Sequence, residues 1–130
     1  MTRIGIIDDH PLFRHGLTLM LQQLRYTVSI EAGNGKDFMR QLEYQSLPDV
    51  ILLDAQLDGM NSYSVLQWIR VSHPHVPVIV LHHNRDFHYV LQLIRGGAYT
   101  HLEKTATPNE VHRTIQEVIT NHLPQDLDKL

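Results

Sequence analysis

The run Val50-Ile51-Leu52-Leu53-Asp54 decides how the rest of this 130-residue chain is interpreted. Four consecutive apolar residues, some of them β-branched, are typical of a strand that is buried on both faces, as in a parallel sheet. Pro48 precedes the run and the turn-like Asp58-Gly59 follows it. The run ends in an acid, and open α/β sheets place their ligands at the carboxyl ends of their strands. Asp54 is therefore either a reactive group at such an edge or a cap on the following loop or helix.

Apolar periodicity on both sides of this strand predicts five strands that alternate with five helices. This alternation favours an α/β fold in which helices cover both faces of a parallel sheet. The strands are expected at 3–8, 26–32, 50–54, 78–81 and 98–103. The helices follow each strand, with candidate caps or first residues at Pro11, Asn61 or Ser62, Asp86 and Thr107-Pro108-Asn109-Glu110.

The last two helices carry a predicted interaction surface. The buried stripe of the fourth helix is expected to hold Phe87, Val90, Leu91 and Ile94. A second set of side chains is expected to face outward from the two helices, namely Tyr89, Leu93, His112 and Arg113. Exposed apolar groups beside a mixed-charge helix indicate a dimer surface. The alternative is isolated exposed apolar residues, which are common.

Composition excludes several classes of protein. The chain has no cysteine, so disulfides and thiolate metal sites are impossible. Its net charge of -3, without a basic stripe, argues against a general nucleic-acid surface. No apolar run is long enough to cross a membrane, and the N-terminus enters a strand pattern rather than a signal peptide. We expect one cytoplasmic domain that does not associate with a membrane.

Polar side chains stand at the ends of the predicted strands. Asp8-Asp9 ends the first strand, Asp54 the third and His82 the fourth, and Lys104 follows the fifth. In a doubly wound sheet these ends converge, and clustered carboxylates need a hard cation such as Mg²⁺ or a lysine to offset their repulsion. A carboxylate beside such charges is a good phosphoryl acceptor, because they stabilise the phosphoryl oxygens while it attacks in line. Each acid taken alone is better explained by a helix cap or a surface ion pair.

The chain resembles the bacterial response-regulator receiver domains of the flavodoxin-like, CheY-like type. The motifs that carry the resemblance are Ile6-Ile7-Asp8-Asp9-His10, Ile51-Leu52-Leu53-Asp54, and Gly97-Ala98 leading to Leu102-Glu103-Lys104. The start from Asp8 to Leu17 and the helix start Pro108-Asn109-Glu110-Val111 are similar to the NarL/FixJ group. The resemblance covers residues 2 to about 122. It implies a doubly wound, five-stranded parallel sheet in the order 2-1-3-4-5.

The resemblance also implies a role for each residue at the strand ends. Asp54 matches the phospho-accepting aspartate, and Lys104 matches the lysine that contacts the phosphoryl group. Asp8 and Asp9 match the acidic pair that holds Mg²⁺ together with Asp54, and the backbone carbonyl of Gln56 matches the remaining protein ligand. The phosphoryl donor would be a sensor histidine kinase or a small phosphodonor. Such a domain catalyses only its own phosphorylation and dephosphorylation.

Three positions depart from the family pattern. His82 stands where the family usually has Thr or Ser, His101 where it usually has Tyr or Phe, and Asp58 where a proline is common. We hypothesise that His82 donates a hydrogen bond to a phosphoryl oxygen and that His101 responds to the new charge. One alternative is a receiver that no longer switches in this way. Another is a metal site made from His82, His83 and His88.

The predicted output is a change passed to another domain or protein. NarL-type receivers usually precede a helix-turn-helix domain, so we expect a receiver over 1–122, with 123–130 as a tail or the start of a linker after Leu123-Pro124. DNA would then be contacted only through an output domain outside this chain. Homodimerisation on activation and transcription regulation follow from the resemblance, and Gln56 and Asn84 occupy positions that influence dephosphorylation. The alternative function is a phosphorylation-independent dimerisation or interaction module.

Overall fold

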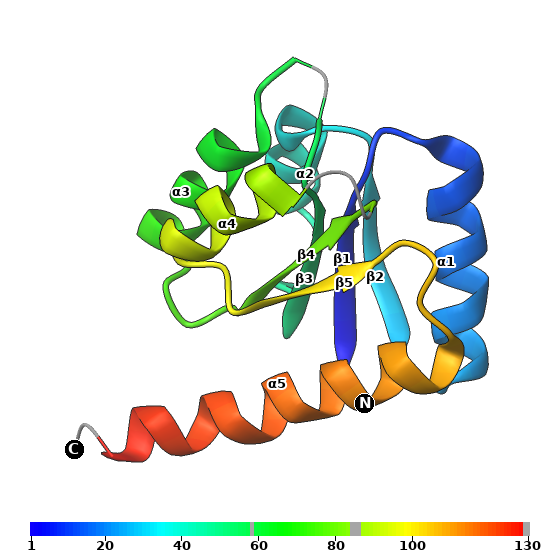
Figure 1. The fold of residues 1–130 in the computed structure, drawn as a ribbon, viewed down its shortest axis with the longest axis vertical. Coiled ribbons are helices and arrows are strands. Elements are labelled where there is room, and N and C mark those ends of the chain that lie inside the picture. The colour runs from blue at the N-terminus through cyan, green and yellow to red at the C-terminus, as the bar shows by residue number, and fades with distance from the viewer. Residues whose placement is uncertain (58, 84–86, 129–130) are drawn as a thin grey trace.

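The computed structural model describes residues 1–57, 59–83 and 87–128, with side chains as far as residue 121. Helices and a central sheet form three layers (Figure 1). The turn predicted at Asp58, the position of Asn84 and the cap predicted at Asp86 lie outside the described residues. None of the described helices is both long and apolar enough to span a membrane.

The sheet has five parallel strands in the order β2-β1-β3-β4-β5, which confirms the predicted fold class. Its strands are β1 (Arg3–Ile7), β2 (Thr27–Ala32), β3 (Val50–Asp54), β4 (Val78–His82) and β5 (Thr100–Glu103). The register pairs Ile7 with Leu53 and Asp54 with Leu81. The carboxyl ends of β1, β3 and β4 therefore lie side by side at one edge, and the residues that follow them are brought together there.

Within the described residues, five helices cover the two faces of the sheet. They are α1 (Pro11–Gln23), α2 (Gly35–Gln41), α3 (Ser62–Ser72), α4 (Phe87–Arg95) and α5 (Pro108–Asp128). Side chains alternate along β3, so that Val50 and Leu52 join the core beneath α1 and α5, and Ile51 and Leu53 join the core beneath α2, α3 and α4. The continuous apolar run predicted this burial on both faces correctly.

Side-chain caps fix the starts of α2, α3 and α5, and those of α3 and α5 lie at predicted positions. Asn34 accepts a hydrogen bond of 2.8 Å from the N–H of Asp37 at the start of α2. Asn61 does the same for α3, and the Thr107 hydroxyl accepts from the N–H of Glu110 in α5. These caps set where each connection crosses the edge of the sheet and hence where the site lies.

Two predictions about the helices are wrong. The buried residues of α4 are Val90 and Leu93, whereas Phe87 and Leu91 are exposed. The reason is that α4 has one broad apolar face, which runs from Leu93 through Val90 to Leu91, and sequence spacing does not show which part of that face meets the core. The backbone of α5 also continues past Pro124 to Asp128. Proline removes one helical hydrogen bond, but a helix can continue through it with a kink.

Candidate functional site

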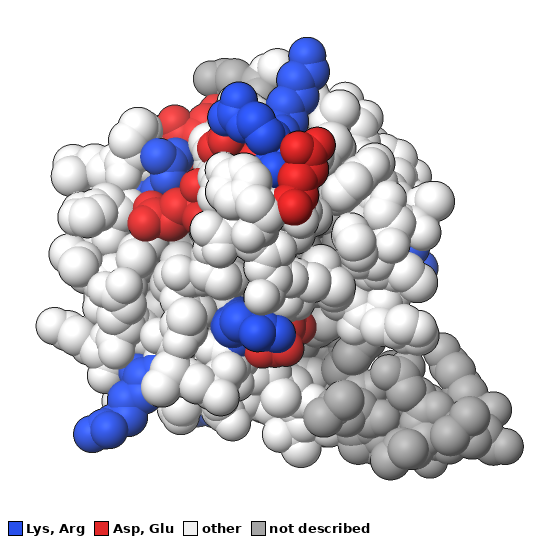
Figure 2. Space-filling view, turned by 180° about the vertical axis from the view of Figure 1, so that it is seen from behind, with Lys and Arg blue, Asp and Glu red and all other residues white. Residues whose placement is uncertain are grey.

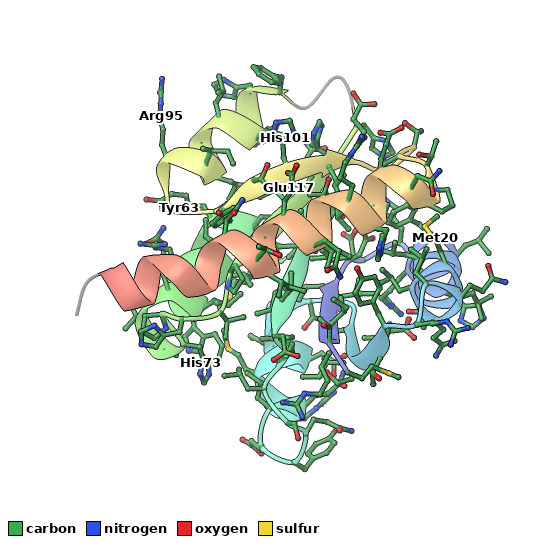
Figure 3. The ribbon with its side chains drawn as sticks, turned by 90° about the horizontal axis from the view of Figure 1, so that it is seen from below. Met20, Tyr63, His73, Arg95, His101 and Glu117 are labelled. Atoms are coloured by element: carbon green, nitrogen blue, oxygen red, sulfur yellow. The ribbon has the colours of Figure 1, made fainter. Side chains whose placement is uncertain are left out.

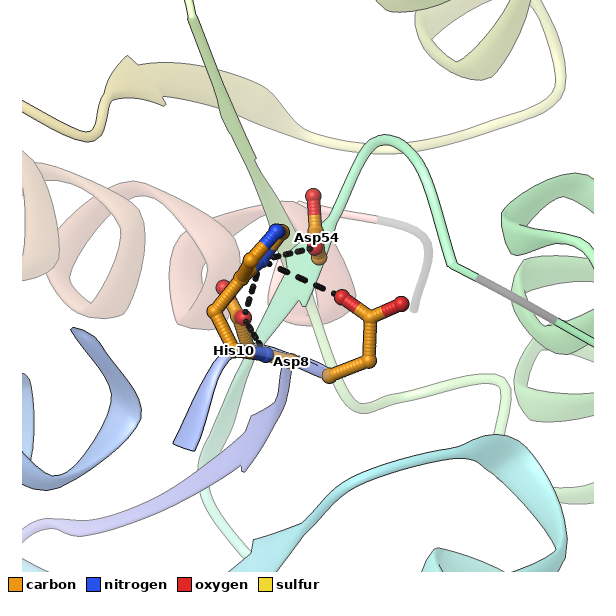
Figure 4. A group of neighbouring side chains, drawn as sticks. Asp8, His10 and Asp54 are labelled. Carbon is orange, nitrogen blue, oxygen red and sulfur yellow. Dashed lines mark hydrogen bonds and ion pairs between the residues drawn. The ribbon is translucent and has the colours of Figure 1, made fainter. Parts of the chain in front are cut away.

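The end of β1 and the end of β3 bring three carboxylates together. Asp8 is fully buried and Asp54 is almost so, while Asp9 is partly exposed. One ligand atom from each of Asp8, Asp9, His10 and Asp54 lies within 4.8 Å of all the others (Figure 4). Within the described part of the chain this is the one such group, so the alternative of a metal site from His82, His83 and His88 gains no support.

Lys104, which follows β5, places its ammonium group among these carboxylates. Its Nζ lies 2.8 Å from Asp8 Oδ2 and 3.3 Å from Asp54 Oδ2, and its side chain is buried. The backbone N–H of Lys104 donates to the carbonyl of His82, and its Nζ lies 4.7 Å from the ring centroid of Phe13. The lysine predicted from the sequence is therefore held in the site by strand pairing and by an aromatic face.

Asp54 is held by the loop that follows β3. The N–H of Gln56 donates to Asp54 Oδ1 at 3.1 Å. The Ser62 hydroxyl, at the start of α3, donates to the backbone carbonyl of Asp54 at 2.6 Å and accepts from the N–H of Leu57 at 3.2 Å. Ser62 is buried, and its role beneath the acceptor was not predicted, because the sequence indicated only a cap. These bonds leave Asp54 Oδ2 facing Lys104.

The environment of Asp54 keeps its carboxyl group unusually basic. Burial raises the pKa of Asp54 to about 6, and the neighbouring charge of Asp8 acts in the same direction. The N–H of Gln56 and the ammonium of Lys104 lower this pKa without cancelling the effect of burial. The carboxylate form of Asp54 is therefore one that an added cation would stabilise.

The donor groups fit a hard divalent cation. Three carboxylates meet one ammonium group at this edge of the described structure, so negative charge remains to be offset. Carboxylate oxygens are the ligands that Mg²⁺ prefers, and Mg²⁺ retains several of its waters. Gln56 lines the same cavity of about 640 Å³ as Asp9 and Asp54.

His10 is part of the site and received no role from the sequence. Its Nδ1 lies 3.1 Å from Asp8 Oδ1, 3.1 Å from Asp9 Oδ1 and 3.5 Å from Asp54 Oδ2 (Figure 4). Lys104 Nζ lies 3.2 Å from the same nitrogen. The position of His10 directly after Asp8-Asp9 could have indicated that it belongs to the site. The sequence does not show, however, which way its ring points.

His82 and His101 form a second group beside this site. His82, the last residue of β4, is buried, and its Nε2 lies 2.8 Å from Nδ1 of His101. The other ring nitrogen of His82 lies 3.0 Å from the carbonyl oxygen of His83. Both nitrogens therefore have partners other than Asp54 in this structure. His101 is exposed on β5, between α4 and α5 (Figure 3).

Three of the four side chains predicted for a dimer surface are exposed. Tyr89, His112 and Arg113 are exposed, but Leu93 is buried, in contrast to the prediction, because α4 is rotated relative to the expected stripe. The ring of His112 is hydrogen-bonded at 2.8 Å to the hydroxyl of Tyr26. On the face shown in Figure 2, basic and acidic side chains lie next to one another without a basic stripe.

A parallel sheet in this order, with acids and a lysine at its carboxyl edge, defines the class of CheY-like α/β domains. The chain belongs to the response regulator receiver domain family, which matches residues 4–116. It is 34% identical over 110 residues to the uncharacterized transcriptional regulatory protein YxjL of Bacillus subtilis (strain 168), covering 84% of this chain and 50% of that protein. It is 33% identical over 117 residues to the transcriptional regulatory protein LiaR of the same organism, covering 89% and 55%.

Solved structures show the same fold. A response regulator receiver domain protein from Clostridium thermocellum superposes with a TM-score of 0.83 at 22% identity, over 93% of this chain and 96% of that one. A CheY-like receiver domain protein from Methanospirillum hungatei JF-1 gives 0.84 at 19% identity, over 96% and 98%. The chain spans about half the length of the curated relatives it matches.

Proposed function

We propose that this receiver accepts a phosphoryl group on Asp54 and passes the resulting change to an output domain that regulates transcription. The observation that carries the proposal is the convergence of Asp8, Asp9, Asp54 and Lys104 at one edge of the sheet. Asp8, Asp9, Asp54 and the backbone carbonyl of Gln56 would hold Mg²⁺. Bound Mg²⁺ would supply positive charge to the phosphoryl oxygens.

The chain's own groups account for the transfer step. A carboxylate oxygen of Asp54 forms the new bond to phosphorus as the bond from phosphorus to the donor breaks and the donor leaves with that electron pair. The donor is the phosphohistidine of a sensor kinase or a small acyl phosphate. The N–H of Gln56 orients the acceptor through Oδ1, and the ammonium of Lys104 stabilises charge on the transferred group.

The pair of His82 and His101 is the proposed route from the acceptor to the surface. Their 2.8 Å hydrogen bond connects the buried end of β4 to the exposed side of β5. New negative charge at Asp54 would attract the ring of His82, and His101 would lose or exchange this bond. The exposed residues Tyr89, His112 and Arg113 are the proposed surface for a second copy of the chain.

A specific observation favours a second candidate function. Both ring nitrogens of His82 are engaged with groups other than Asp54. A receiver whose switch residues stay in this arrangement would act as a dimerisation or interaction module without phosphorylation. We further propose that residues 1–122 form the receiver and that 123–130 lead to the output domain, through which alone DNA would be contacted.

Intact-mass measurement separates the two functions. The chain is incubated with Mg²⁺ and a small acyl phosphate, and we expect an adduct of one phosphoryl group that is absent in Asp54→Asn. Asp37→Asn, a change in the exposed ion pair with Arg40, is the matched control and keeps the adduct. Absence of the adduct from the wild-type chain, together with absence of Mg²⁺ binding, supports the interaction module instead.

A further inference from the structure

We propose that Nδ1 of His10 is a direct metal ligand, which lets the acidic pocket bind late first-row divalent cations such as Co²⁺ and Zn²⁺ more tightly than Mg²⁺. This inference rests on the proposed cation site and adds a nitrogen donor to it. The site would then be defined by three carboxylates, the backbone carbonyl of Gln56 and one imidazole.

The position of the ring is the first observation. Nδ1 of His10 lies within 3.5 Å of an oxygen of Asp8, of Asp9 and of Asp54. The four candidate donor atoms all lie within 4.8 Å of one another. A single cation among them would be within reach of all four donors.

The backbone of His10 is fixed, so the ring is held near the three carboxylates. Its N–H donates to Asp8 Oδ1 at 2.8 Å, and its carbonyl accepts from the N–H of Arg14 at 2.9 Å. His10 is the N-cap residue of α1, and Pro11 follows it at the first helical position. The imidazole itself is 59% exposed, so a cation can approach from solvent without opening the core.

The second observation is that the neighbours of His10 Nδ1 include both hydrogen-bond donors and acceptors. If Nδ1 of the neutral ring carries the hydrogen, it can donate to one carboxylate, but it then points a donor at the Lys104 ammonium 3.2 Å away. If Nδ1 carries the lone pair, it can accept from Lys104 but faces the oxygens of Asp8 and Asp9 at 3.1 Å. Neither tautomer satisfies all its neighbours. A cation that accepts the lone pair and the carboxylate oxygens satisfies them together.

The nitrogen donor changes which cation is favoured. Carboxylate and carbonyl oxygens alone suit Mg²⁺, whereas imidazole nitrogen suits Zn²⁺ and its neighbours late in the first row. The chain has no cysteine, so thiolate ligands do not contribute. His10 is therefore expected to determine which divalent cation binds most tightly, while the carboxylates are needed for any divalent cation to bind.

The test uses Co²⁺ alone as the probe with the full chain. In wild type we expect a hyperfine-shifted, exchangeable imidazole N–H resonance in the proton NMR spectrum, which is absent in His10→Ala. The ratio of the Mg²⁺ to the Co²⁺ dissociation constant should fall by about 10-fold or more in this variant, in line with the loss of a ligand contact. His15→Ala, an exposed histidine on α1, is the control and should keep both the resonance and the ratio. His10→Gln should behave like His10→Ala.

The possible failures can be told apart. If Co²⁺ binds but the resonance persists in His10→Ala, or the ratio of dissociation constants does not change, His10 is not a ligand and the inference is overturned, while the carboxylate site stands. If neither Co²⁺ nor Mg²⁺ binds to the wild-type chain, the proposed cation site fails together with the inference. The inference is supported if Asp8→Asn binds neither cation. The two His10 variants should still bind both cations but lose the preference for Co²⁺.

Discussion

The imidazoles of His82 and His101 are joined by a hydrogen bond of 2.8 Å between Nε2 and Nδ1. The carbonyl oxygen of His83, 3.0 Å from Nδ1 of His82, can only accept. In the neutral pair, His82 therefore donates through Nδ1, and its Nε2 accepts from the Nδ1–H of His101. This bond fixes the tautomers of both rings and connects the buried end of β4 to the exposed side of β5.

Replacement of His101 tests the pH dependence of this bond. Although His101 is largely exposed, desolvation of the packed part of its ring lowers its pKa below the usual 6.5, as does the neighbouring His82, while Glu103 opposes them. Because the folded state binds this proton less readily, His101 contributes stability above pH 6.5 that is lost as the pH falls through its folded pKa. The free energy of unfolding of wild type relative to His101→Phe should therefore decrease between about pH 7 and pH 5. Urea denaturation measures it, and a constant difference would contradict this account.

Asp54→Asn should stabilise the protein at neutral pH. The raised pKa of Asp54 means that its contribution to stability is present below 3.8 and is lost as the pH rises through about 6. Without divalent cations, the variant should gain on the order of 1–2 kcal/mol over wild type above pH 7, after allowance for solvent screening. The gain should vanish in acid and shrink when Mg²⁺ is added. Asp37→Asn, which removes a carboxylate from the ion pair with Arg40, is measured in parallel and should not gain stability over wild type above pH 7.

Ser62→Ala should destabilise the fold and slow phosphorylation. The variant loses the bond from the Ser62 hydroxyl to the Asp54 carbonyl and leaves the N–H of Leu57 without that acceptor in a buried site. We expect a loss of about 1–3 kcal/mol in the free energy of unfolding. Ser64→Ala, an exposed serine two residues later, is the matched control. Equal stability of the two variants would rule out the supporting role of Ser62.

Lys104→Gln should reduce the rate of phosphorylation by a small phosphodonor by about 100-fold, the usual effect of losing one preorganised charge contact. The ammonium lies 3.3 Å from Asp54 Oδ2 and is buried, and the glutamine side chain that replaces it carries no positive charge. Intact-mass time courses give the rate. Lys36→Gln, on the exposed side of α2, should leave it unchanged. A rate close to that of wild type in Lys104→Gln would remove the lysine from the mechanism.

Much of the fold and of the acidic site could be predicted from the sequence. The Val50–Asp54 run identified the central strand because burial on both faces leaves a continuous apolar signal. The convergence of Asp8, Asp54 and Lys104 followed from parallel topology, which aligns the carboxyl ends of strands.

The remaining features depend on orientation, which sequence spacing does not encode. The buried face of α4 was misjudged at Leu91 and Leu93 because both lie on one broad apolar face, and only part of that face meets the core. The roles of His10 and Ser62 were not predicted, because each role depends on the direction in which the side chain points. The sequence suggested that His101 responds to charge near His82, but not that both nitrogens of His82 would be engaged with other groups.

The central claim is that charge on Asp54 is reported through His82 and His101. The most direct measurement is the nitrogen-15 NMR spectrum of the imidazoles, recorded with Mg²⁺ before and after addition of a small acyl phosphate. We predict that the ring nitrogens of His82 and His101 shift in wild type and stay unchanged in Asp54→Asn. Unchanged nitrogens in a wild-type chain that carries the phosphoryl group, or the same shifts in Asp54→Asn, would contradict the claim.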